Sequence, residues 1–166
     1  MLDNYDYQCH FIIIKKKYRR IKMPKQVDRA MLMMGRFYEL LCKIPVIGYP
    51  FARLYNRNIG RMIFYTPGSG AKRQKSIDGI KKYLLKTKED MGFPFELIPE
   101  CDTPDSFEFF VGYCPYGYKH PDQAKPCDAA MEMDRVLFRH QGAELTIKES
   151  TVNGAPKCRI LLKMRK

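Results

Sequence analysis

The sequence predicts an α+β domain in which N-terminal helices pack on an antiparallel sheet. Residues 26–91 place apolar side chains at intervals of three and four, as the buried faces of helices do. From Phe93 onward the chain instead has short apolar runs bounded by turn residues. Asn153 and Gly154 lie between two of these runs, which is a strong signal for a β-hairpin. Helices followed by such strands indicate the α+β class, and 166 residues suffice for one domain with its own core.

Three helices are expected in the first half of the chain. Their apolar stripes cover residues 27–42, 47–65 and 77–91. Gly92 follows the third stripe in the position that glycine often takes after a helix. Residues 66–70 separate the second stripe from the third, and they lack the Gly-Lys-Ser/Thr sequence that ends a phosphate-binding loop.

The second half is expected to contain strands and one helix. The predicted strands cover residues 95–98, 107–113, 145–152 and 158–162. Turn residues at 102–105 separate the first two strands, and residues 115–126 form a loop with several prolines. Apolar residues at helical spacing predict a helix over residues 127–139.

Composition divides the chain into two regions. We expect residues 1–25 to form a basic arm and residues 26–166 to form a single domain, helical over 26–91 and strand-rich over 92–166. No early segment resembles a signal peptide, because the apolar run at 11–14 is short and three lysines follow it. We therefore expect a cytoplasmic protein, where cysteines more often bind metal or react than form disulfides.

The positive charge is concentrated in the first half. Residues 1–90 carry 20 lysines and arginines against 7 acidic residues, whereas residues 91–166 carry 10 against 11, and the net charge is +12. This asymmetry predicts an acidic protein partner or an anionic membrane surface, at which the protein would be peripheral. A solvated basic face that aids solubility explains the same charge equally well. Nucleic acid is disfavoured as a partner, because no recognisable nucleic-acid motif accompanies the charge.

Three cysteines in the second half are the main functional signal. Cys114 ends a predicted strand, Cys127 opens the predicted helix, and Cys158 begins the last strand. A sheet that pairs these strands can bring all three thiols to one end. Thiolates are strong nucleophiles and soft metal ligands, so converging cysteines indicate covalent catalysis or the binding of a metal or cluster.

Cys127 is the candidate nucleophile. A thiol in the first turn of a helix lies near the positive end of the helix dipole, which is expected to lower its pKa. Asp128 and Asp134 are neighbours that could orient the thiol or accept its proton. Free cysteine is also among the most buried residue types, so packing is the alternative for each thiol, and we assign Cys9 and Cys42 to it.

Arginines of the second predicted helix are candidate substrate-binding residues. Arg53, Arg57 and Arg61 recur every four residues and form a column along one helix face. Such a column can bind a carboxylate or phosphate of a small-molecule substrate, or it can be a solvated stripe. Tyr116, two residues after Cys114, is included as a further substrate-binding candidate.

A metal site is the alternative to catalysis. Cys101 lies thirteen residues before Cys114, and Cys127 lies thirteen residues after it. With Cys158 these residues could supply four thiolates to zinc or to an iron–sulfur cluster in a redox, sensor or accessory protein. The chain has no Cys-x-x-Cys pair, which most such sites contain, and this argues against a metal.

The cysteine motifs resemble the C-terminal pattern of the L-2-amino-thiazoline-4-carboxylic acid hydrolase family. The resemblance rests on Cys114-Pro115-Tyr116, Cys127-Asp128, and residues 148–154 followed by Cys158. It implies an α+β domain distantly similar to four-vinyl-reductase domains, with a small-molecule site at a cysteine-rich end. It further implies hydrolytic opening of a thiazoline ring.

The chain departs from this family pattern in three places, one of which is the short loop between Cys114 and Cys127, rich in lysine and proline. Arg159 and Ile160 follow Cys158, where the family pattern usually continues with aspartate and Phe. Cys101 adds a fourth thiol that the pattern does not require. The reaction and the metal site are therefore both hypotheses at the level of the sequence.

Overall fold

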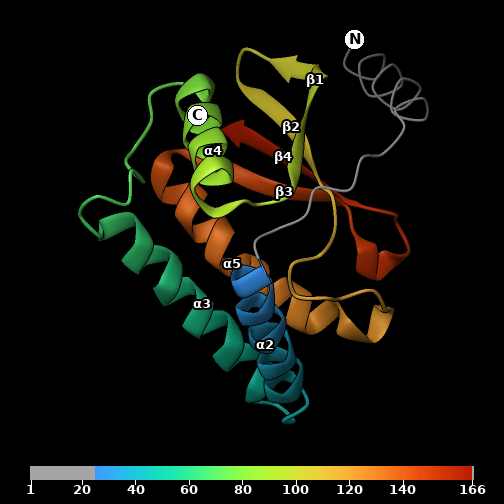
Figure 1. Ribbon diagram of the computed structural model, residues 1–166. Helices are drawn as coiled ribbons and strands as arrows, with labels where there is room; N and C mark the ends of the chain where they lie inside the picture. Colours follow the sequence, from blue (N-terminus) through green and yellow to red (C-terminus); the bar gives the residue numbers. More distant parts are fainter. Residues whose placement is uncertain (1–24, 166) are drawn as a thin grey trace.

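The computed structural model describes residues 25–165, and their side chains from Arg29 onward. Within this range four α-helices, two short 3₁₀ helices and four strands follow one another (Figure 1). The order is α2 (Lys25–Cys42), α3 (Gly48–Tyr65), α4 (Ile77–Met91), β1 (Phe95–Thr103), β2 (Ser106–Val111), η1 (Pro121–Gln123), α5 (Ala124–Gln141), β3 (Ala143–Glu149), η2 (Thr151–Asn153) and β4 (Cys158–Met164). The predicted α+β class is confirmed. The predicted basic arm, residues 1–25, lies almost wholly outside the described residues.

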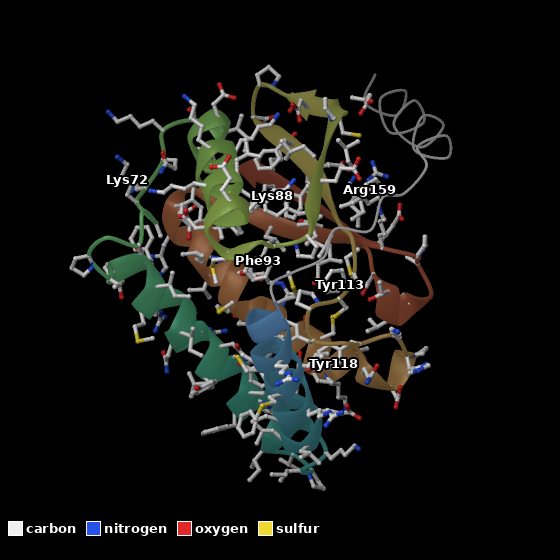
Figure 2. The ribbon with its side chains drawn as sticks, in the orientation of Figure 1. Lys72, Lys88, Phe93, Tyr113, Tyr118 and Arg159 are labelled. Carbon is white, nitrogen blue, oxygen red and sulfur yellow. The ribbon has the colours of Figure 1, made fainter. Side chains whose placement is uncertain are left out.

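The four strands form one antiparallel sheet in the order β1-β2-β4-β3. Successive side chains of a strand point to opposite faces, so the two faces differ in chemistry. On one face, Phe109 of β2 and Ile160 of β4 belong to the main apolar core. On the other face, the neighbouring residues Glu108 and Arg159 form a buried ion pair. Figure 2 shows Arg159 on the side of the sheet away from α4.

Helices cover the apolar face of the sheet in two layers. Ile80 of α4 and Phe138 of α5 pack directly on the sheet residues of the main core. Helix α3 packs along the outer side of α5, and α2 lies against both (Figure 1). A Cβ atom on Gly60 of α3 would lie 2.5 Å from the carbonyl oxygen of Met133 in α5, so the two helices approach closely. Of the N-terminal helices, α4 thus packs on the sheet itself, whereas α2 and α3 pack on α5.

The structure differs from the predicted elements mainly at their ends. Helix α5 begins at Ala124, before Cys127, because Pro126 lies in the first helical turn, where its missing N–H leaves no hydrogen bond unmade. Strand β1 continues beyond residue 98 to Thr103 across an irregularity in its pairing with β2. The β3–β4 connection is longer than a tight turn, since η2 occupies the end of the strand predicted over residues 145–152. Gly154 adopts the left-handed conformation there, with φ of 89°.

None of the described helices combines the length and the apolar character needed to cross a bilayer.

Candidate functional site

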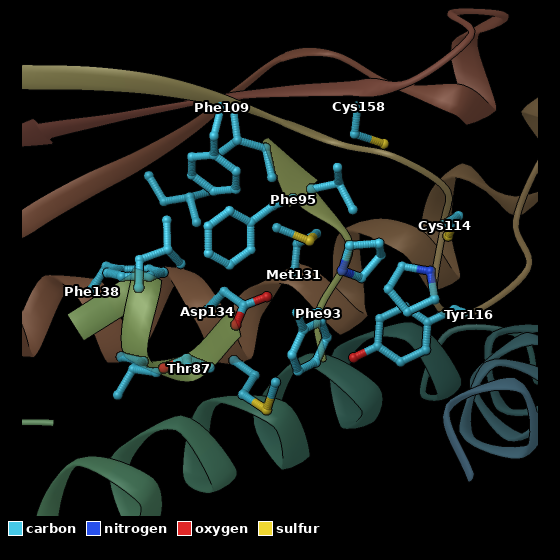
Figure 3. Close-up of a pocket in the computed structure, with 18 of the residues that line it drawn as sticks. Thr87, Phe93, Phe95, Phe109, Cys114, Tyr116, Met131, Asp134, Phe138 and Cys158 are labelled. Atoms are coloured by element: carbon cyan, nitrogen blue, oxygen red, sulfur yellow. The ribbon is translucent and has the colours of Figure 1, made fainter. Parts of the chain in front are cut away.

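A cavity of about 160 Å³ lies between the sheet, α4, α5 and the segment that follows β2. Most of its wall is apolar, as Figure 3 shows for Phe93, Phe95, Phe109 and Phe138. The residues named by the sequence analysis that line it are Cys114, Tyr116, Cys127, Asp134 and Cys158. Five of the predicted site residues, from three separate segments of the chain, therefore meet at one cavity.

Helix α5 supplies one wall of the cavity. Cys127, Met131, Asp134 and Phe138 follow one another at intervals of four, three and four residues, so they lie on one face of the helix. This is the face that α5 turns toward the sheet, where Phe138 joins the main core. Asp134 thus lies on a stripe that is otherwise apolar or weakly polar.

The three thiols reach the cavity from different directions. Val111, the last residue of β2, is paired with Cys158, the first residue of β4, so Cys114 follows close to the same edge of the sheet. Cys127 approaches from the first turn of α5. Figure 3 shows Cys114 and Cys158 at one end of the cavity. All three thiols line the cavity. Among the described residues they do not form a group that could hold a metal ion.

The environment of these thiols differs from the one predicted for a nucleophile. Burial, together with the nearby thiols of Cys114 and Cys158, raises the pKa of Cys127 to about 12. Burial also raises the pKa of Cys114. The prediction that the helix dipole lowers the pKa of Cys127 is wrong. Burial removes water from around the thiolate, and this raises the pKa by more than the positive end of the helix can lower it. At neutral pH Cys127 is a protonated thiol.

Tyr116 is held in the cavity wall by α2 and by neighbouring aromatic rings. Its ring stacks on Tyr118, with centroids 5.8 Å apart, and meets the edge of Tyr38 at 6.1 Å. A Cβ atom on Gly35 of α2 would lie 2.4 Å from the carbonyl oxygen of Tyr116. Figure 2 shows Tyr118 near α2. The segment after β2 is therefore fixed against a helix that lies about eighty residues earlier in the chain.

Asp134 points into the cavity (Figure 3). Burial raises its pKa to about 6, and the nearby charge of Arg135 opposes this shift. Its side chain accepts no hydrogen bond and forms no ion pair with any described residue. Its partial exposure is to the cavity that it lines.

The arginine column of α3 binds a carboxylate of the protein itself. Arg53 donates a hydrogen bond of 2.7 Å to Glu132 of α5, and Arg57 donates one of 2.9 Å to the other oxygen of the same carboxylate. Burial raises the pKa of Glu132, but the two arginines outweigh this effect and hold it below its ordinary value. Arg53 and Arg57 do not line the cavity and join α3 to α5 instead. Arg61 is exposed and lies outside the cavity.

Asp128 belongs to the same ion-pair network. It accepts a hydrogen bond of 2.6 Å from the hydroxyl of Tyr49 and pairs with Arg135 at 2.8 Å. Burial raises its pKa, but Tyr49 and Arg135 outweigh the burial, so the pKa is lowered overall. Asp128 lies on the α3 side of α5 and does not line the cavity, so the structure separates it from the catalytic role predicted beside Cys127.

The described residues do not assemble the predicted four-cysteine metal site. Cys101 is buried with Ile98 and Phe110, and Phe110 belongs to the sheet face opposite Phe109. The sheet therefore separates Cys101 from the cavity. Within residues 25–165 no group of three or more histidine, cysteine, aspartate or glutamate side chains could hold a metal ion.

The contribution of α4 and of the segment after it to the cavity was not predicted from the sequence. Thr87 of α4, Phe93 and Pro94 line the cavity, as does Met131 of α5. The spacing of Cys127, Met131 and Asp134 on one helix face was available in the sequence and could have marked the wall of a site. No comparable signal distinguishes Thr87 or Phe93 from ordinary core residues.

The chain matches no protein-family model, and no curated protein matches it significantly. Among solved structures it is similar to a trafficking protein particle complex subunit 3 from Naegleria fowleri, which was crystallised covalently bound to palmitic acid. The two share 7% sequence identity over 98% of this chain and 92% of that chain, with a TM-score of 0.43.

Proposed function

We propose that the protein binds a small, largely apolar molecule in the cavity between the sheet, α4 and α5. The observation that carries this proposal is the cavity itself, about 160 Å³ in volume and lined mainly by aromatic and aliphatic side chains. Apolar cavities of about 150 Å³ in other proteins remain dry and accept a molecule the size of benzene. Binding sites for small molecules are commonly apolar cavities with a few polar groups, which is the composition seen here.

Binding is better supported than hydrolysis. The resemblance to the thiazoline-ring hydrolases predicts a reactive thiol at this site, and that reaction stays a prediction. Cys127 is protonated at neutral pH because burial raises its pKa to about 12, and Asp128 is engaged by Tyr49 and Arg135. Cys127 is therefore not activated as a nucleophile in this state of the protein, and Asp128 is not placed to accept its proton.

Cavity-filling substitution tests the binding proposal. Toluene, indole and benzyl alcohol, each titrated into the protein, should raise the melting temperature, because a ligand that binds only the folded state stabilises it. Val111 lines the cavity, so Val111→Phe should fill part of it and abolish this stabilisation. Leu54→Phe, which adds bulk on the exposed face of α3, should leave the rise in melting temperature unchanged. Absence of stabilisation by all three molecules, or unchanged stabilisation in folded Val111→Phe protein, would exclude the proposal.

We also infer that the protein associates with anionic membrane surfaces through the turn between α2 and α3, and that it does so in the cytoplasm. Large apolar side chains are exposed around this turn, among them Leu40 at 67%, Val46 at 91% and Ile47 at 65% exposure. Val46 also has a φ of 64°, a strained conformation for a β-branched residue. Exposed apolar surfaces of this extent mark sites of interaction with other proteins or with membranes.

Charge favours a membrane as the occupant of this surface. On α2, exposed Met33, Phe37 and Leu40 lie on one helix face. Exposed Arg29, Arg36 and Lys43 run beside them at intervals of seven residues. An apolar stripe flanked by basic residues is the pattern of helices that lie in the interface of anionic lipids. A second copy of the chain would instead bring two sets of like charges together.

Vesicle sedimentation tests this surface. Vesicles of phosphatidylcholine with phosphatidylserine should bind the protein at low salt, and binding should weaken as salt screens the charges. Val46→Ser combined with Ile47→Ser should reduce binding several-fold, because both side chains are exposed and contribute little to the core. Met62→Ser, at the other end of α3, is the control. Dimerisation that depends on Val46 and Ile47, with no vesicle binding, would show that a second copy occupies the surface.

A further inference from the structure

Asp134 is the charged residue of the cavity wall. Among the described residues that line the cavity, Asp134 is the one with a carboxylate, and none of these lining residues is a lysine or an arginine. It shares its helix face with Cys127, Met131 and Phe138, none of which can offset its charge. An ionised carboxylate in apolar surroundings is unfavourable unless a cation or hydrogen-bond donors accompany it.

The protein supplies no such partner within the residues described. Asp134 has no hydrogen bond and no ion pair there. The charge of Arg135 acts on Asp134, but its side chain forms no ion pair with it and pairs instead with Asp128 at 2.8 Å. The hydroxyl of Thr87 is occupied, since it donates to the carbonyl oxygen of Tyr83 in its own helix. The carboxylate therefore faces the cavity with its hydrogen-bonding capacity unused.

Tyr116 offers a second unused polar group. Its ring is fixed by Tyr118 and Tyr38, and no described residue forms a hydrogen bond with its hydroxyl. Figure 3 shows Asp134 and Tyr116 on either side of the Phe93 ring, with the Tyr116 hydroxyl turned toward Phe93. Two polar groups on an otherwise apolar wall limit the chemistry of the molecule that the cavity can bind.

We propose that the ligand of this cavity is an apolar molecule bearing one protonated nitrogen, which pairs with the carboxylate of Asp134. This inference rests on the proposed function of the cavity and specifies its ligand class. The ammonium group supplies the positive charge that the wall lacks, and the hydroxyl of Tyr116 remains available for a second polar atom of the ligand. The volume limits the apolar part to about one aromatic ring or an aliphatic group of similar size.

The same arrangement selects against other ligands. A neutral molecule of the same shape leaves the charge of Asp134 unpaired, and a carboxylate ligand adds a second negative charge in a site of low dielectric constant. Affinity should therefore fall from an amine to a neutral alcohol to a carboxylic acid. Asp134 would thus decide which ligands the cavity prefers.

Calorimetry with three matched molecules tests the proposal. Benzylamine, benzyl alcohol and benzoate share one ring and differ in their charge. At pH 7.5 benzylamine should bind at least tenfold more tightly than benzyl alcohol, and benzoate should bind most weakly. Asp134→Asn should remove the preference for the amine while benzyl alcohol still binds. Asp90→Asn, which changes an exposed aspartate at the end of α4, should leave the preference intact.

The pH dependence provides a second readout. Affinity for benzylamine should fall as the pH is lowered through about 6, where Asp134 becomes protonated, whereas affinity for benzyl alcohol should not fall, because protonation removes the unpaired charge. The other titratable groups around Asp134 are Tyr83 of α4, Tyr116 after β2, Arg135 and Cys127 of α5, and the thiols of Cys114 and Cys158. The pKa values of both tyrosines and of Cys127 are raised, so these groups do not titrate near pH 6.

The outcomes separate the two proposals. If benzyl alcohol binds as tightly as benzylamine in both the wild-type and Asp134→Asn proteins, the ligand class is wrong and the binding cavity stands. If no member of the series, toluene or indole binds to the folded protein, both proposals fail.

Discussion

The hydroxyl of Tyr118 donates a hydrogen bond of 2.8 Å to the backbone carbonyl of Gly35. This contact joins the segment after β2 to the middle of α2. Next to it the carbonyl oxygen of Tyr116 lies so close to Gly35 that a Cβ atom there would be 2.4 Å away. The position of Tyr116 in the cavity wall therefore depends on a glycine in the N-terminal part of the chain.

Replacement of Gly35, a residue of α2, should consequently shift Tyr116 in the cavity wall. Gly35→Ala introduces a methyl group that cannot fit without movement of the Tyr116 backbone, so we expect a loss of about 1–3 kcal/mol in the free energy of unfolding. Affinity for benzylamine should also fall several-fold, measured by calorimetry on the folded fraction. Gly48→Ala, which crowds the carbonyl oxygen of Leu41 between α2 and α3, should destabilise the protein without changing this affinity. Equal affinities for the two variants would contradict the role of Gly35 in positioning Tyr116.

Asp134 should destabilise the protein in the absence of ligand. Its pKa in the folded state is about 6, above the ordinary value of 3.8, so folding opposes its ionisation. The stabilising effect of the protonated form is complete below about pH 3.8 and is lost as the pH rises through about 6. Asp134→Asn should therefore raise the free energy of unfolding at pH 7 by about 1–3 kcal/mol, measured with urea. Asp90→Asn should have little effect at this pH, and a less stable Asp134→Asn protein would disprove the prediction.

The thiol of Cys127 should react slowly at neutral pH. Its pKa of about 12 leaves very little thiolate at pH 7, and the rate of alkylation follows the thiolate fraction. The rate of modification by iodoacetamide, followed by mass spectrometry of the Cys127 peptide, should rise about tenfold per pH unit between pH 7 and 9. Benzylamine or toluene in the cavity should slow it further. A rate at pH 7 above that of glutathione would restore Cys127 as a candidate nucleophile.

Glu132 should be important for the packing of α3 on α5. Its carboxylate is almost fully buried and receives hydrogen bonds from Arg53 and Arg57, which are themselves partly exposed. Glu132→Gln removes the charge and replaces one of the two acceptor oxygens by an NH2 donor, so one arginine loses its hydrogen bond, and we expect a loss of about 1–3 kcal/mol after allowance for solvent screening. Urea unfolding at pH 7 measures this loss. Glu89→Gln, at an exposed position of α4, serves as the control, and equal stabilities of the two variants would argue against the network.

The elements of the fold could be predicted because their signals are local. The apolar stripe that begins at Ile77 and the left-handed Gly92 mark the start and end of α4, and both are readable from the sequence. The ends of α5 and of β2 were less predictable, since Pro126 is compatible with a first helical turn as well as with a loop. The eight residues between β3 and β4 include η2, which replaces the tight turn that Asn153 and Gly154 suggested.

The candidate site was only partly predictable. Convergence of Cys114, Cys127 and Cys158 follows from antiparallel pairing, which the motifs in the sequence suggested. The role of Arg53 could not be inferred, because the acceptor Glu132 lies 79 residues away and only the packing of α3 on α5 brings the two together. The side of the sheet on which Cys101 lies depends on the irregular pairing of β1, which changes the face that a strand residue occupies.

The sequence by itself determined the α+β class, the order of the helices and strands, and the set of thiol-bearing segments, because hydrophobic periodicity and turn chemistry act over a few residues. Tertiary structure decided which groups are charged, paired or free. Cys127 lost the expected reactivity and Asp134 acquired a raised pKa because both became buried in an apolar cavity. Asp128, six residues before Asp134, became part of an ion-pair network instead. Burial and pairing depend on contacts between distant segments, so only the folded chain distinguishes these side chains.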